Sequence, residues 1–152
     1  MVRFTDLHCT IDTHISPRTQ EEAQAVADEL LRLVTEELNT RQGYQESIPV
    51  EEDGKLRSVT MLNASVEMGE KYKRIHIHYN LSIVHETKVL LKDANRRLQD
   101  WFNLHSPWGT ECYAKVRLLD SSRAKNYNVK KGVYAEPVTA RMETGEAGED
   151  SV

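Results

Sequence analysis

The sequence predicts an α+β domain with a split βαβ, ferredoxin-like arrangement, in which an antiparallel sheet carries helices on one face. Stretches that alternate apolar and polar residues, typical of half-buried strands, are interleaved with stretches of helical period. Their order is strand, helix, strand, strand, helix, strand, helix, and a short polar turn between the second and third strands indicates a hairpin. The length of 152 residues suits one domain. The other face of such a sheet stays open, and an active site is expected there.

The first strand and the first helix have clear boundaries. Residues 4–15 alternate as a strand does, and Thr19 followed by Glu22 forms a capping-box pattern that starts a helix. The segment 39–43 is expected to end this helix, and the polar segment 44–55 to form a loop. The alternation divides the first strand into two faces, with Leu7, Cys9 and Ile11 on one and His8, Thr10, Asp12 and His14 on the other.

The remaining elements follow from the same patterns. The first six elements and a final helix make one domain over residues 1–135, and the small, acidic residues 136–152 are expected to be a disordered tail. The expected elements are strands at 55–68, 75–84 and 111–119, a turn at 69–74, and helices at 85–102 and 120–132.

Composition is that of an ordinary globular protein, with 39% hydrophobic and 29% charged residues. No apolar run reaches the length of a membrane span, and the first ten residues lack the apolar stretch of a signal peptide. Cys9 and Cys112 have no C-x-x-C spacing, which favours a reducing compartment. We therefore expect an intracellular protein that does not partner with a membrane.

The net charge of −4 hides an uneven distribution. Residues 1–70 carry a balance of −8, residues 71–131 a balance of +8, and residues 132–152 a balance of −4. A basic region on an acidic body is typical of a surface that binds nucleic acid. Solvated lysine and arginine side chains on a helix and two strands would give the same balance.

The segment "RIHIHYN" places His76 and His78 two residues apart, which in a strand puts them on the same face. Glu67 lies near the end of the preceding strand, so a hairpin can bring it beside either histidine. Two imidazoles and a carboxylate suit Mn²⁺ or Mg²⁺, and also Zn²⁺, Co²⁺ or Ni²⁺. A chance decoration of a wet sheet face would look the same.

The segment "AKNYNVKKG" offers a second chemical pattern. On a helix, Tyr127 and Lys130 share a face because they are three residues apart. A phenol becomes a useful nucleophile when a cation lies beside it and a metal neutralises the phosphate it attacks. A half-buried tyrosine beside solvated lysines is the alternative for this segment.

Together these segments resemble the HUH endonuclease domain of replication initiators (Rep) of small circular single-stranded DNA viruses and plasmids. "SVEMGEKYKRIHIHYNLSI" resembles the family's second motif with its acidic ligand, and "NYNVKKG" resembles the third motif with its nucleophilic tyrosine. Element order over residues 5–134 agrees with that family. The first motif is only loosely matched, by "RFTDL" or "CTIDT", and the first helix and the segment 44–55 are long for a compact viral Rep.

The resemblance implies that Glu67, His76 and His78 hold a divalent ion, Mn²⁺ or Mg²⁺, and that Tyr127 attacks single-stranded DNA with Lys130 beside the phosphate. The implied activity is nicking and joining at an origin stem-loop through a 5′-phosphotyrosyl link, which initiates rolling-circle replication, in the host nucleus if the source is viral. No Walker A sequence is present, so a helicase would lie outside this chain. The expected DNA contacts are Arg74, Lys115, Arg117 and Arg123.

Three other functions fit the same residues. A non-enzymatic single-stranded nucleic-acid-binding module of ferredoxin-like fold would use aromatic residues on the open face. A different metal hydrolase would use an activated water and would not need Tyr127. The third alternative is an interaction domain without an active site.

Overall fold

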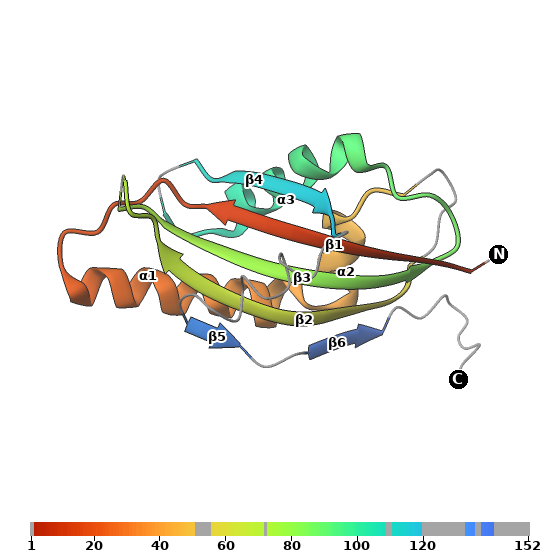
Figure 1. Cartoon of the computed structure of the whole chain (residues 1–152), viewed down its shortest axis with the longest axis horizontal. Helices are drawn as coiled ribbons and strands as arrows, with labels where there is room; N and C mark the ends of the chain where they lie inside the picture. Colours follow the sequence, from red (N-terminus) through yellow and green to blue (C-terminus); the bar gives the residue numbers. More distant parts are fainter. Residues whose placement is uncertain are drawn as a thin grey trace.

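In the computed structural model, a twisted antiparallel sheet forms one layer and the helices form the second layer behind it (Figure 1). The structure describes residues 2–50, 56–71, 73–108, 111–119, 133–135 and 138–141. The described elements are β1 Arg3–Asp12, α1 Gln20–Arg32, the π-helical η1 Leu33–Leu38, α2 Arg41–Ser47, β2 Leu56–Met68, β3 Ile75–His85, α3 Leu91–His105, β4 Tyr113–Leu118, β5 Val133–Ala135 and β6 Val138–Arg141.

The strands run in the order β4-β1-β3-β2-β5, and β6 also pairs with β2. All of these pairings are antiparallel. The order β4-β1-β3-β2 places β3 between the two strands that the first helical crossover connects, which is the split βαβ arrangement. The predicted fold class is therefore confirmed.

Alternation in β1 and β3 separates an apolar face from a polar face. Ile75, Ile77 and Tyr79 are almost completely buried on the side of the helices. On β1, Ile11 pairs with Ile77, Cys9 with Tyr79 and Leu7 with Leu81, and these three β1 residues are equally buried in the same core. The predicted division of the first strand is confirmed, and His76 and His78 of β3 lie on the opposite side from this core.

Strand β2 does not alternate from end to end, because a bulge interrupts it. Met61 pairs with Leu81, and Asn63 pairs with the next residue, Asn80, so Leu62 is an extra residue. Just before the bulge the core residues are odd-numbered, Val59 and Met61, and after it they are even-numbered, Ala64 and Val66. The extra residue therefore turns the last part of β2 over.

Helix α1 begins as the capping box predicts. Thr19 Oγ1 accepts a hydrogen bond from the Glu22 backbone N–H at 3.0 Å. The Glu22 carboxylate accepts from Arg18 N–H at 2.6 Å, which is one residue earlier than in the usual reciprocal pattern. The helical path continues into η1, whose leucine and valine side chains are buried in the core.

The prediction of a loop over 44–55 is wrong for its first four residues, which belong to α2. Thr40 caps this second helix through a 2.9 Å bond from Gly43 N–H to Thr40 Oγ1. A Cβ on Gly43 would lie 2.3 Å from Leu38 O, so only glycine permits this close approach to the end of η1. Residues 51–55 of the expected loop lie outside the described residues.

Helix α3 covers the outer edge of β4 with three amide side chains spaced four residues apart. Asn95, Gln99 and Asn103 accept hydrogen bonds from backbone N–H groups of β4 and of the residue before it, at 2.6, 3.1 and 2.6 Å. The donors are Val116, Ala114 and Cys112. This amide ladder satisfies donors that an edge strand would otherwise expose to another chain.

Two further boundaries differ from the sequence predictions. The helix expected at 85–102 begins only at Leu91, because β3 continues to His85 and residue 89 bridges to residue 50. The sheet extends past residue 135, since residues 138–141 of the expected disordered tail form β6. The expected helix at 120–132 and the rest of the tail lie outside the described residues. None of the described helices is both long and apolar enough to cross a membrane.

The amide ladder predicts a measurable loss when one acceptor is removed. Gln99→Met keeps side-chain size and helix propensity but leaves the Ala114 N–H without its acceptor, which should cost about 1–3 kcal/mol of unfolding free energy. Urea unfolding measures this loss. The control Arg96→Met changes an exposed position of the same helix and should stay within about 0.5 kcal/mol of the parent. Equal stabilities of the two variants would contradict the role of the ladder.

Candidate metal centre

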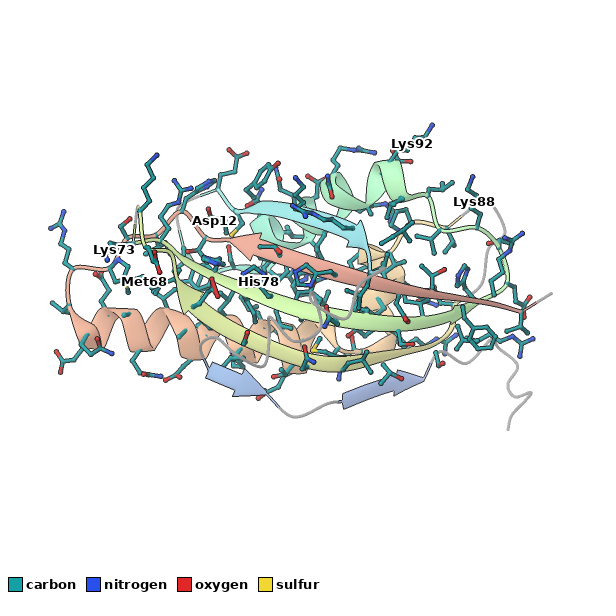
Figure 2. The ribbon with its side chains drawn as sticks, in the orientation of Figure 1. Asp12, Met68, Lys73, His78, Lys88 and Lys92 are labelled. Carbon is teal, nitrogen blue, oxygen red and sulfur yellow. The ribbon has the colours of Figure 1, made fainter. Side chains whose placement is uncertain are left out.

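Three ligand-type side chains meet on the helix-free face of the sheet. Glu67 lies directly opposite His76 on the neighbouring strand, and His78 follows on the same face of β3. Figure 2 shows His78 over the middle of the sheet, on the side away from the helices. Glu67 reaches this face only because the bulge at Leu62 turns the end of β2 over.

The distances within this cluster are short. Glu67 Oε1 lies 2.9 Å from His76 Nε2 and 3.7 Å from His78 Nε2. One ligand atom from each residue lies within 4.8 Å of the other two. The two imidazole rings are 4.8 Å apart, centroid to centroid, and meet edge to face. The sequence prediction that these three residues come together is borne out by the geometry.

These separations fit a shared divalent ion. Two donors bound at 2.0–2.2 Å to one ion, at angles of 90–110°, lie about 2.8–3.6 Å apart. The Glu67 to His76 separation falls in this range, and a small movement brings His78 into it. Two imidazole nitrogens and one carboxylate oxygen suit Mn²⁺, Fe²⁺, Co²⁺, Ni²⁺ and Zn²⁺, and leave positions for further oxygen ligands. The cluster can therefore hold a metal ion, which would replace the proton between Glu67 and His76.

The ring nitrogens that face away from the cluster also have partners. His78 Nδ1 lies 3.1 Å from Thr10 Oγ1 on β1, and His76 Nδ1 lies 3.4 Å from Arg74 O. When Nδ1 carries the proton and donates it to these oxygens, Nε2 presents its lone pair to the cluster. Such contacts fix the tautomer and the orientation of metal-binding histidines.

Burial sets the charge of His78. Removal from water, followed by the positive charge that His76 can carry, lowers the pKa of His78 to about 4, against a partial opposing effect of Glu67. His78 is therefore neutral near pH 7, and the neutral imidazole is the form that binds metals.

A second layer of polar residues surrounds His78. The His8 ring stacks against the His78 ring with centroids 5.5 Å apart. His8 Nδ1–H donates to Asn80 Oδ1 at 2.8 Å, and Asn80 Nδ2 lies 3.4 Å from Asn63 Oδ1. These residues come from β1, β3 and β2, so the network links the three central strands through side chains.

This face is less open than the sequence led us to expect. His78 is only 8% exposed, and Ser65 and Asn80 are fully buried although they lie on the side away from the helices. Buried polar groups need hydrogen-bond partners. His8 and Asn63 supply them for Asn80, and Thr10 supplies one for His78.

The expected DNA contacts occupy different places. Arg74 lies beside the cluster and forms an ion pair with Asp12 on β1, with 3.1 Å between Arg74 Nη2 and Asp12 Oδ2. Lys115 and Arg117 are exposed on β4, at the edge of the same face. The predicted residues Arg123, Tyr127 and Lys130 lie outside the described residues.

The histidines without an assigned role have structural partners. His85 is buried. Its Nε2 lies 2.8 Å from Thr5 Oγ1, and its Nδ1 donates to Thr87 O. His105 stacks on Trp101 at the end of α3 and donates from Nδ1 to Trp101 O at 2.8 Å. Trp108 packs against the core.

The alternation of the first strand placed His8 and Thr10 on the correct face, but the sequence analysis assigned them no role beside the metal cluster. Their partners across β3 are Asn80 and His78, a register that alternation alone does not give. No protein-family model, curated protein or solved structure matches this chain.

Removal of the carboxylate tests the cluster. Glu67→Gln keeps the size of the side chain but removes its charge. Loss of a residue that only hydrogen-bonds to a metal ligand lowers affinity roughly 10- to 100-fold, so loss of the ligand charge itself should lower the Mn²⁺ affinity by more than that. Calorimetric titration with Mn²⁺ measures this. The control Glu70→Gln removes an exposed carboxylate three residues away and should leave the affinity unchanged. Equal losses in both variants would argue for nonspecific attraction of the cation.

Thr10 provides a subtler test. Thr10→Val keeps the shape and removes the oxygen next to His78 Nδ1, so Mn²⁺ affinity should fall about 10- to 100-fold. Thr10→Ser restores the hydroxyl and should recover most of the affinity. Calorimetric titration with Mn²⁺ compares the affinities of the two variants, and urea unfolding checks that both are folded. Failure of Ser to recover what Val loses would show that Thr10 acts through packing.

Proposed function

We propose that this protein is a metal-dependent nuclease that nicks and rejoins single-stranded DNA, as the HUH endonuclease domains of replication initiators do. The observation that carries the proposal is the convergence of Glu67, His76 and His78 within 4.8 Å on one sheet face. The resemblance of the sequence around this cluster, and of the Y-x-x-K segment, to that family supplies the reaction. Mn²⁺ or Mg²⁺ is the proposed ion.

The described residues supply the binding and orienting part of this chemistry. A bound ion would polarise a phosphate oxygen and lower the charge that an approaching nucleophile meets. Glu67 and the two histidines would hold it on the sheet. Thr10 and Arg74 O hold the rings, and the network around His78 limits their movement. Such preorganisation aligns a scissile phosphate for in-line attack.

In the proposed reaction, the Tyr127 oxygen forms a bond to phosphorus as the bond to the 3′-oxygen breaks. The phenol loses its proton and the leaving 3′-oxygen gains one, so the products are a 5′-phosphotyrosyl link and a free 3′-hydroxyl. Lys130 would lie beside the phosphate and balance its charge. The number of phosphate ester bonds is unchanged, so rejoining is the reverse step and needs no ATP.

The biological role that follows is initiation of rolling-circle replication at an origin stem-loop, with a helicase supplied by another domain or protein. The proposal places the protein inside a cell, in the host nucleus if its source is viral. Arg74, Lys115, Arg117 and Arg123 are the proposed contacts to the DNA backbone. The competing function is a non-enzymatic nucleic-acid-binding module, which the basic edge of the sheet also fits.

A covalent adduct is the most specific sign of this reaction. Single-stranded DNA labelled at its 3′ end, incubated with the protein and Mn²⁺ and then denatured, should give a labelled protein band on a denaturing gel. Tyr127→Phe should abolish the band, because phenylalanine has no oxygen to attack phosphorus. Lys130→Gln should slow its formation.

Tyr113→Phe is the matched control, because Tyr113 is an exposed tyrosine at the edge of the sheet that bears the cluster. It should leave adduct formation unchanged. An adduct that survives Tyr127→Phe and disappears with Tyr113→Phe would contradict the proposal, because it would show that Tyr113 is the nucleophile. Cleavage without any adduct would favour a hydrolase with an activated water, and binding without cleavage would favour the non-enzymatic module.

A further inference from the structure

Strand β4 presents one aromatic and two basic side chains in a row on the face that bears the metal cluster. Tyr113, Lys115 and Arg117 lie opposite Asp12, Thr10 and His8 on β1, so all three share the helix-free face. Every second residue of a strand is about 6.5–7 Å further along. Tyr113 is 51% exposed, and Lys115 and Arg117 are exposed as well. We call these three residues the β4 row.

The β4 row stands on a fixed support. Between its members, Ala114 and Val116 are buried in the core. Their backbone N–H groups donate to Gln99 and Asn95 of α3. The backbone of β4 is therefore held by β1 on one side and by the amide ladder on the other, while the side chains of the row face solvent.

The β4 row runs beside the metal cluster. Lys115, Thr10 and His78 are successive partners across β4, β1 and β3. Two strand spacings, about 10 Å, separate the backbone at Lys115 from the backbone at His78. Asp12, next to Tyr113, would repel a phosphate, but its ion pair with Arg74 offsets that charge.

We infer that the β4 row is a track for single-stranded nucleic acid, in which a base stacks on Tyr113 while Lys115 and Arg117 bind successive phosphates. The inference rests on the proposed function, and it names the path that the strand takes to the cluster. Exposed aromatic rings next to cations along a groove or strand are the usual means of binding single strands without reading their sequence.

The structure argues against a peptide on this surface. A peptide that extended the sheet would need the outward N–H groups of β4, and those at Ala114 and Val116 already donate to α3. What β4 offers instead is side chains, and these carry two positive charges and one flat ring. A polyanion with bases that can stack fits this combination.

Binding in the absence of metal tests the track separately from catalysis. The probe is a fluorescent, mixed-sequence DNA strand of about 20 nucleotides, longer than the roughly 4–16 that one such sheet surface covers. Fluorescence anisotropy in EDTA over a series of KCl concentrations gives the affinity and its salt dependence. The double variant Lys115→Gln/Arg117→Gln should reduce the slope of log affinity against log salt by about 1.4, because each lost phosphate contact removes about 0.7.

Tyr113→Ala should weaken binding about 5- to 150-fold with little change in the salt slope, because it removes stacking and no charge. Tyr113→Phe keeps the ring and should bind like the parent. The aromatic control is Phe4→Ala, which removes an exposed ring at the distant end of β1. The charge control is Lys92→Gln/Arg96→Gln, which removes two exposed charges from α3.

The inference would be overturned by a salt slope that falls equally for the β4 and α3 double variants, or by an affinity that Tyr113→Ala leaves unchanged. No binding by the parent protein would overturn it as well. These outcomes are distinct from failure of the proposed nuclease, which would show as normal binding in EDTA together with no covalent adduct in Mn²⁺.

Discussion

The bulge at Leu62 is the constraint on which the candidate site depends. A β-strand alternates its side chains strictly, so without an extra residue Glu67 would share a face with Met61 and point toward the helices. With the extra residue, Val59 and Met61 pack in the core, and so do Ala64 and Val66, while Glu67 faces the histidines. The inserted Leu62 thus keeps Val59 and Met61 before it, and Ala64 and Val66 after it, in the core, and still delivers a carboxylate to the opposite face.

The two faces of the sheet differ in polarity. On the helix side, side chains from β1, β2 and β3 build a continuous apolar core with α1 and α3. On the other side, the central strands carry polar residues that bond to one another, as with His8 and Asn80 or Thr10 and His78. Burying such groups is costly unless every member has a partner. The face therefore combines a largely buried polar centre with an exposed basic edge on β4.

Much of the fold could be predicted from the sequence, because the signals were local and periodic. The alternation in β1 and β3, the Thr19 cap and the hairpin before β3 each depend on residues close together in the chain. Prediction failed at helix α2, whose determinants are local in the chain but not periodic. Helix α2 follows from Thr40 as a cap and from the close approach of Gly43 to Leu38, which a polar composition concealed.

The candidate site divides in the same way. The pairing of His76 and His78 on one face follows from their spacing, and the pairing with Glu67 was expected from the hairpin. Strict alternation from Met61 would have placed Glu67 in the core. The expected contact between Glu67 and the histidines forms because of the bulge at Leu62, which the sequence did not reveal. Thr10 could not be given its role beside His78 in advance, because that contact depends on the register between β1 and β3. Tyr127 and Lys130, which lie outside the described residues, remain predictions from sequence.

Anomalous diffraction from crystals grown with Mn²⁺ tests the central claim most directly, because it locates the ion without reference to activity. The account predicts one strong anomalous peak on the helix-free face, about 2.0–2.3 Å from Glu67 Oε1 and from the Nε2 atoms of His76 and His78. A strong peak at other residues, or an ordered Glu67, His76 and His78 with no peak between them at saturating Mn²⁺, would contradict it.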